Sequence, residues 1–178
     1  MTARQDAEFT DYVSARLPSL RRLALLLCQD WHAADDLVQS ALTKTYLHWG
    51  RAAGADSTDA YVRATLVREF IRERRTGWAR RVSPVELLPE AQSPLPDRDG
   101  FLDLQAAVAS LPRRQRAVLV LRFFCDMNVE QSAEILGCTP GTIKSQTSKA
   151  LASLRREIGV QPDGDSAHDP WGEVSNHA

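Results

Sequence analysis

The 178-residue sequence contains no apolar run that approaches the roughly 20 residues a helix needs to cross a bilayer. Its first residues, Met-Thr-Ala-Arg-Gln-Asp-Ala-Glu, lack the apolar stretch of a secretory signal peptide. These two absences predict a protein that works in the cytoplasm and has no membrane partner.

Cysteine and histidine are also scarce. The three cysteines, Cys28, Cys125 and Cys138, are widely spaced and lie in or beside apolar segments, which favours free buried thiols. Cys28 and His32 have helical spacing, but a metal site would need more ligands than their neighbourhood offers. The four histidines are accompanied by no nucleophile, carboxylate pair or phosphate loop. We therefore expect no metal, no cofactor and no enzymatic activity.

A large excess of one charge is absent as well, because the net charge is only −1. The charges are nevertheless separated along the chain. Seven arginines and two glutamates lie between Tyr61 and Arg81, whereas four acids and no lysine or arginine follow Gly159. The distribution of charge matters more than its sum for nucleic-acid binding, so DNA stays a candidate partner.

Apolar residues recur with helical spacing over most of the chain, and no strand-like alternation competes with it. The predicted helices lie at about 7–29, 32–49 and 58–75, and start again at about 101 and 112. Pro18 predicts a kink or a break near Arg16. Residues 50–57 are predicted to form a loop, and Tyr46 and Trp49 are expected in the core. The inward side of the second helix comprises Leu37, Val38, Ala41, Leu42 and Thr45.

The periodicity is lost between the two helical groups. The helix breakers there are Pro84, Pro89, Pro94, Pro96 and Gly100. We predict an all-α fold with two small helical domains joined by a flexible Pro-rich linker. The domains are placed at 7–76 and 101–159, the linker at 77–100 and an acidic disordered tail at 160–178.

Residues 128–156 predict a short helix, a tight turn and a longer helix. Gly137 stands where a helix end needs a left-handed residue. Thr139 fits the N-cap position of the next helix, and Pro140 fits its first turn. The predicted buried stripe of that helix is Ile143, Thr147, Ala150, Leu151 and Leu154. The opposite side carries Lys144, Ser145, Ser148, Lys149, Arg155 and Arg156.

This cationic and hydroxylic side suits the major groove of DNA, where cations bind phosphates and hydroxyls contact base edges. The domain at 101–159 is therefore predicted to be a DNA-binding helix-turn-helix. An amphipathic helical hairpin with a solvated polar face is the alternative that this segment alone leaves open.

Several motifs in a fixed order resemble one family. Residues 34–39 read Ala-Asp-Asp-Leu-Val-Gln, and residues 111–119 read Leu-Pro-Arg-Arg-Gln-Arg-Ala-Val-Leu. Val-Glu-Gln-Ser-Ala follows at 129–133, and Gly-Thr-Ile-Lys-Ser at 141–145. Over about 9–158 the chain resembles the extracytoplasmic-function sigma factors of the sigma-70 superfamily. The run Leu-Arg-Phe-Phe-Cys-Asp at 121–126 points to the SigE-like actinobacterial branch.

The resemblance implies that the first domain is a sigma-2 domain, which docks on the β′ coiled coil of core RNA polymerase. The docking residues carried over are Asp35, Asp36, Leu37, Val38 and Gln39. The acids would pair with cations, and exposed apolar residues of the helix would supply buried area. Without the family pattern, the two acids would simply favour the positive end of a helix.

The resemblance also implies two DNA-reading surfaces. The minus-10 surface comprises the loop at 50–59 and the residues Tyr61, Arg63, Arg68 and Arg72, which would hold unpaired bases and phosphates. The sigma-4 domain would contact the β flap of the polymerase and read the minus-35 element. Its base and phosphate contacts would be Thr142, Lys144, Ser145, Ser148 and Lys149, with Arg113, Arg114 and Arg116 as backbone clamps.

Two positions depart from the family pattern. Ser40 stands where the family usually has an acid, and Arg68 lies near the position of a frequent asparagine. The expected function is a transcription initiation factor that directs core RNA polymerase to specific promoters and assists promoter melting. The alternative is a stand-alone helix-turn-helix regulator. An anti-sigma factor is a further candidate partner, as in many members of the family.

Overall fold

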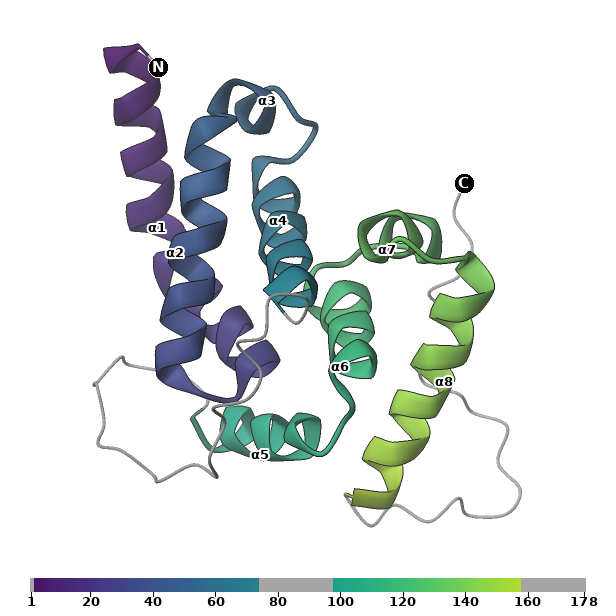
Figure 1. Cartoon of the computed structure of the whole chain (residues 1–178). Helices are drawn as coiled ribbons and strands as arrows, with labels where there is room; N and C mark the ends of the chain where they lie inside the picture. The colour runs from purple at the N-terminus through teal and green to yellow at the C-terminus, as the bar shows by residue number, and fades with distance from the viewer. Residues whose placement is uncertain (1, 74–97, 158–178) are drawn as a thin grey trace.

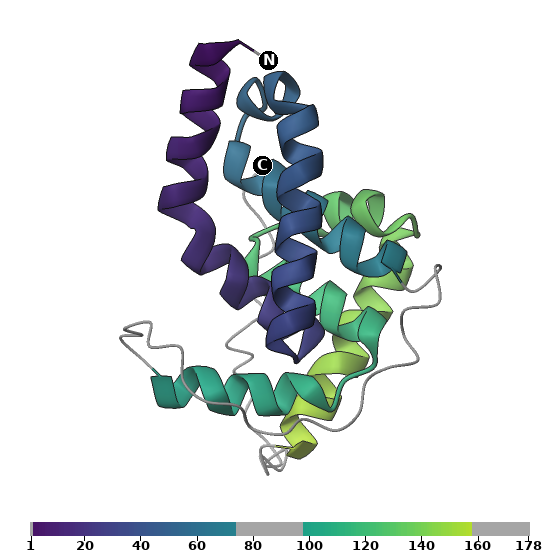
Figure 2. The ribbon, with the colours of Figure 1, turned by 60° about the vertical axis from the view of Figure 1, so that its left-hand side comes forward.

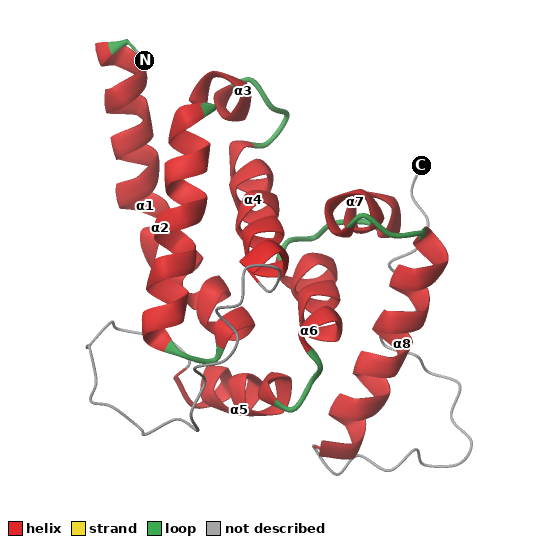
Figure 3. Ribbon diagram, viewed as in Figure 1, coloured by secondary structure: helices red, strands yellow, loops and turns green. Residues whose placement is uncertain are grey.

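The computed structural model describes residues 2–73 and 98–157, and these are helical with short connections (Figure 3). The first unit comprises α1 (Ala3–Cys28), α2 (Trp31–Leu47), α3 (Trp49–Ala53) and α4 (Thr58–Glu73). The second unit comprises α5 (Arg98–Ala109), α6 (Arg113–Leu119), the π-helical turn η3 (Val120–Phe124), α7 (Val129–Leu136) and α8 (Pro140–Glu157). The predicted all-α fold is confirmed. Residues 77–97 of the predicted linker and the predicted tail lie outside the described residues, whereas residues 98–100, also assigned to the linker, form the first turn of α5.

The first helix starts with a capping box, in which Thr2 and Gln5 satisfy each other's backbone N–H groups. It then continues through Pro18 as one helix, so of the predicted alternatives, a kink or a break, the break does not occur. Figure 2 shows the helix bending in its lower part. A bend is expected because proline has no N–H to donate to the preceding turn.

α1, α2 and α4 form a bundle whose core includes Leu20, Leu37, Leu66 and Phe70 (Figure 1). The predicted loop at 50–57 begins as the short helix α3, because Trp49 is anchored. Its ring is buried against Phe9 and Tyr12, with ring centroids 5.2 and 5.7 Å away.

Of the two aromatic residues expected in the core, only Trp49 is confirmed there. Tyr46 is 38 % exposed, so its predicted burial is wrong. Tyr46 instead lies at the surface, where its hydroxyl donates to Asp6 at 2.9 Å.

The helix-turn-helix forms as predicted. Gly137 ends α7 with φ +61°, a left-handed conformation that glycine adopts at little cost. The Thr139 hydroxyl accepts a hydrogen bond from the Thr142 N–H at 3.2 Å, which caps the start of α8. Ile143 and Ala150 are fully buried against α6 and α7, so this part of the predicted stripe is confirmed.

The two units share one hydrophobic core. A single cluster of buried side chains includes Leu27 and Phe70 of the first unit together with Val120, Leu121 and Met127 of the second. Figures 1 and 2 both show α6 beside the lower end of the first bundle. The second unit therefore packs on the first in the described structure.

One carboxylate is buried inside the first unit. Glu69 is 6 % exposed, and its Oε1 lies 2.5 Å from the Lys44 Nζ. Its Oε2 accepts from the Ser40 hydroxyl at 3.3 Å and lies 3.4 Å from an Arg72 nitrogen. These partners offset the cost of removing the charge from water. Nowhere in the two described stretches is a helix both long and apolar enough to cross a membrane.

We predict that Gly137→Ala destabilises the chain by about 1–2 kcal/mol, because a Cβ disfavours the left-handed conformation. Gly141→Ala is the matched control, since its Cβ would only make an ordinary contact of 3.8 Å with Thr139. Urea unfolding should show this loss for Gly137→Ala and no loss for Gly141→Ala. Equal stability of the two variants would contradict the assigned turn.

We predict that Lys44→Ala destabilises the chain by on the order of 3 kcal/mol, because it removes the nearest countercharge of buried Glu69. Arg4→Ala breaks an ion pair whose side chains are 88 % and 44 % exposed, and should leave the stability almost unchanged. Thermal or urea unfolding measures both values. Similar small losses would mean that the Glu69 carboxylate does not depend on Lys44.

Candidate nucleic-acid and partner interfaces

The outer face of α8 is a continuous polar surface. Lys144, Ser145, Ser148 and Lys149 are all exposed and follow the i, i+1, i+4, i+5 spacing of one helix face. Because α6 and α7 cover the opposite side, this face is open to a ligand in the described structure. It combines two cations for phosphates with two short hydroxyls that can approach base edges.

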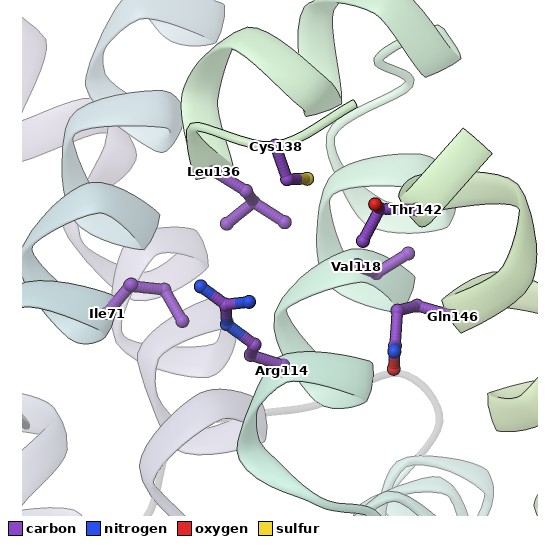
Figure 4. A pocket seen from close by; sticks show the side chains of 7 residues that line it. All are labelled: Ile71, Arg114, Val118, Leu136, Cys138, Thr142 and Gln146. Carbon is purple, nitrogen blue, oxygen red and sulfur yellow. The ribbon is translucent and has the colours of Figure 1, made fainter. Parts of the chain in front are cut away.

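Thr142 differs from the other four candidate residues of α8. It is half-buried, and its hydroxyl lies 2.9 Å from the Thr139 hydroxyl. It also lines a small crevice between the units. Figure 4 shows the crevice side chains, which are Ile71, Arg114, Val118, Leu136, Cys138, Thr142 and Gln146. Thr142 therefore stands at the rim of the exposed face rather than on it.

The three arginines at the start of α6 point in different directions. Arg114 is exposed at the crevice, whereas Arg113 and Arg116 face the first unit. The Arg113 guanidinium lies 3.5 Å from the centroid of the Phe70 ring and donates to the Phe70 carbonyl. Of the three arginines predicted to bind the DNA backbone, Arg114 is exposed to solvent. Arg113 and Arg116 instead donate to backbone carbonyls of the first unit in this structure.

Arg116 is surrounded by backbone carbonyls of both units. It donates to the Leu27 carbonyl of α1 at 2.6 Å, and to the carbonyls of Ala109 and Leu111 at 3.1 Å. Burial lowers the pKa of Arg116 from its ordinary value, because a low-dielectric surrounding disfavours the charged form. The guanidinium still remains charged, since arginine titrates far above neutral pH.

The four candidate minus-10 residues occupy two sides of α4. Tyr61, Arg68 and Arg72 are spaced i, i+7 and i+11, which places them on one helix face, with both arginines exposed. Arg63 points elsewhere: it pairs with Asp59 at 2.7 Å and donates to the Phe124 carbonyl of the second unit at 3.0 Å. The structure thus places Tyr61, Arg68 and Arg72 on one face of α4, and Arg63 on another.

The candidate docking helix α2 presents polar residues outward. Asp36 and Gln39 are exposed, whereas Leu37 and Val38 are only 0 % and 3 % exposed. The predicted inward position of Leu37 and Val38 is therefore confirmed, and the exposed apolar area that the resemblance implies for this helix does not come from them. Their inward position is what the helical period predicts, because they share a face with Ala41.

A neighbouring contact, between Arg21, Asp35 and Trp31, was not predicted from the sequence. Asp35 accepts two hydrogen bonds from Arg21 at 2.7 and 2.8 Å, and the Arg21 guanidinium lies 5.4 Å from the centroid of the Trp31 ring. Trp31 is 49 % exposed. A large aromatic residue at the first position of a helix, outside its apolar stripe, was the available signal for an exposed apolar contact.

Ser40 has a local explanation. Its hydroxyl donates to the buried Glu69 carboxylate of α4, which already occupies the space between α2 and α4. A carboxylate at position 40 would face this charge at close range and repel it. The departure from the family pattern is therefore consistent with the position of Glu69.

Comparison with known proteins gives matches to two family descriptions. Residues 12–80 match Sigma-70 region 2, and residues 101–154 match Sigma-70, region 4. The RNA polymerase sigma-E factors of Streptomyces avermitilis and Streptomyces coelicolor are each 37 % identical over 160 residues, covering 85 % of this chain and 85 % and 86 % of theirs. The ECF RNA polymerase sigma factor SigM of Mycobacterium tuberculosis is 29 % identical over 149 residues, or 82 % of this chain and 74 % of its own.

A solved structure is similar across both units. It is the sigma factor RpoE in complex with the anti-sigma factor NepR from Bartonella quintana. The TM-score is 0.66 at 26 % identity, and the match covers 86 % of this chain and 98 % of that one.

Proposed function

The chain belongs to the sigma-70 family, in its extracytoplasmic-function group, and from this we propose how its surfaces divide the work of promoter recognition. It is a transcription initiation factor that binds core RNA polymerase and directs it to specific promoters. The proposal concerns which residues do so. The proposal rests on membership of the family and on the exposed polar faces of α2, α4 and α8.

We assign residues 7–76 to a sigma-2 domain and 101–159 to a sigma-4 domain, with 77–100 between them and 160–178 as a tail. The region 2 and region 4 matches support these bounds to within a few residues. The sigma-2 domain would dock on the polymerase β′ coiled coil, and the sigma-4 domain on its β flap. The place of action would be the cytoplasm, where the polymerase is.

The docking surface on α2 is proposed to centre on Asp36 and Gln39. Both are exposed, and a carboxylate beside an amide can accept hydrogen bonds from cationic side chains of a coiled coil. Trp31 would add the apolar area that Leu37 and Val38 cannot provide. Leu37 and Val38 would fix the position of α2 by their burial in the core. Asp35 would contribute through its hydrogen bonds with Arg21 of α1.

The minus-35 element would bind the outer face of α8. Lys144 and Lys149 would contact phosphates, and Ser145 and Ser148 would contact base edges. Since hydroxyls discriminate bases weakly, sequence-dependent DNA shape would supply part of the specificity. Thr142 and Arg114, at the rim of this face, would contact the adjoining backbone.

The minus-10 element would bind α4 and the loop before it. Arg68 and Arg72 would hold phosphates, and the Tyr61 ring would lie against an unpaired base. Capture of unpaired bases is how binding energy assists melting, because it stabilises the separated strands. Neither surface needs to bind tightly, since the polymerase holds both near their targets at a high effective concentration.

A stand-alone helix-turn-helix regulator is not favoured, because it would leave the polar face of α2 and the basic face of α4 without a role. We propose no catalytic activity for the chain itself. An anti-sigma factor is proposed as a regulatory partner, because the similar sigma factor RpoE was solved in complex with one. Run-off transcription with core polymerase on a library of genomic fragments tests the proposed function and identifies the promoters.

We predict that Asp36→Arg weakens association with core polymerase by at least about tenfold, since one good charge contact is replaced by repulsion. Asp11→Arg makes the same charge change at another exposed position, on α1, and should leave binding unchanged. Co-purification and fluorescence titration measure the effect, and circular dichroism checks the helical fold. Full polymerase binding by Asp36→Arg would remove the proposed docking surface.

We predict that the isolated protein binds duplex promoter DNA only weakly, with a Kd on the order of 10⁻⁶ M or higher at physiological salt. The reason is that each surface offers few phosphate contacts. Gel-shift or anisotropy titration measures this affinity. Nanomolar binding with a two-fold symmetric footprint in the absence of polymerase would favour the stand-alone regulator instead.

A further inference from the structure

A short loop joins α3 to α4 inside the first unit. It comprises residues 54–57, and Figure 3 shows it at the upper end of the first bundle. Gly54, Asp56 and Ser57 of this loop are exposed. We call these four residues the minus-10 loop, because they directly precede the helix that is proposed to bind the minus-10 element. The conformation of the loop depends on what holds α3 and α4, which are its two ends.

The α3 end of the loop is held by aromatic packing. Trp49, the first residue of α3, is only 4 % exposed. Its ring lies against Phe9 and Tyr12 of α1, with ring centroids 5.2 and 5.7 Å away. The Trp49 Nε1 is buried and has no hydrogen-bond partner among the described residues. The position of α3 therefore depends on the packing of this ring against α1 rather than on a hydrogen bond of its side chain.

The α4 end of the loop is held through a carboxylate. Asp59, in the first turn of α4, accepts a hydrogen bond from the Tyr12 hydroxyl at 3.1 Å. Arg63 pairs with the same carboxylate at 2.7 Å, and Arg16 of α1 lies 3.7 Å from it. Burial, together with the nearby charge of Asp59, raises the pKa of Tyr12. The hydroxyl therefore keeps its proton and donates to Asp59 at neutral pH.

One side chain of α1 thus contacts both ends of the loop. We propose that Tyr12 is a positioning residue for the minus-10 element, because its ring holds Trp49 before the loop and its hydroxyl holds Asp59 after it. This inference rests on the proposed function of α4 and of the loop before it. Tyr12 is half-buried and acts through the loop, which it keeps in a conformation ready for an unpaired base.

Holding both ends lowers the free-energy cost of capturing a base. A mobile loop must lose conformational freedom when it binds, whereas a preformed loop has already lost that freedom when the chain folded. Polar groups in fixed positions also fit some bases better than others, while a mobile loop adjusts to all bases more equally. Loss of the Tyr12 hydroxyl is therefore expected to reduce the affinity for unpaired strands and the discrimination between them.

The first test measures amide hydrogen exchange in the full-length free chain by mass spectrometry. Tyr12→Phe removes the hydroxyl and keeps the ring. It should speed exchange in peptides that span the minus-10 loop and its two ends by about fivefold or more, and leave peptides of α8 unchanged. Tyr46→Phe is the matched control, because it removes a hydroxyl that donates to Asp6 at 2.9 Å and contacts neither Trp49 nor Asp59 through that bond.

Equal exchange of the loop peptides in Tyr12→Phe and Tyr46→Phe would overturn the proposal. A double substitution gives a second check on the contact. Asp59→Ala removes the acceptor, so Tyr12→Phe added to it should speed exchange no further. Independent, additive effects of the two substitutions would contradict the assigned hydrogen bond.

The second test uses the complex of the chain with core polymerase and a pool of short single DNA strands of random sequence. The unaltered chain and Tyr46→Phe should enrich the same sequence. Tyr12→Phe should bind the enriched strand about fivefold more weakly and discriminate less against its single-base variants. Its affinity for core polymerase should stay unchanged. A purely structural role of Tyr12 would lower polymerase affinity or leave the discrimination intact, and either result would contradict the proposal.

The two tests separate this inference from the proposed function. If the complex with the unaltered chain enriches no strand, the proposed minus-10 surface is refuted, and the role of Tyr12 in base capture with it. The exchange rates require neither DNA nor polymerase. They therefore decide independently whether Tyr12 holds the two ends of the loop.

Discussion

The structure depends on the burial of Phe70 at the end of α4. Its side chain completes the core of the first bundle, its ring supports the Arg113 guanidinium, and its carbonyl accepts a hydrogen bond from the same residue. One residue therefore joins the apolar core of the first unit to the contact with the second. Because α2 packs on α4, the orientation of the polar face of α2 follows from the same anchor.

The interaction surfaces arise from the division of each helix into two sides. α2, α4 and α8 each direct one stripe into the core, and this leaves the opposite stripe for solvent or a partner. The outer stripe of α2 carries an acid, and those of α4 and α8 carry cations. A chain with a net charge of −1 can thus offer surfaces of opposite sign to a protein partner and to DNA.

The helix-turn-helix could be predicted from the sequence because its signals are local. Gly137 and Thr139 act on their own turns, and the apolar period of α8 depends on one helix only. The position of Leu37 was harder, because the family motif and the helical period gave different expectations, and the structure agrees with the period. The roles of Arg63 and Arg116 were not predictable, since composition marks a cation but does not indicate which side of the helix faces another unit.

The contacts that hold the two units together use main-chain oxygens as acceptors. Every residue type supplies such an oxygen, so changes at Leu27 or Phe124 can leave the acceptor in place. Only the arginine donors would then need to be kept during evolution. A substitution at a residue that supplies the carbonyl would require no compensating change at the arginine. Covariation between aligned relatives should consequently underestimate this interface, even where it is retained throughout a lineage.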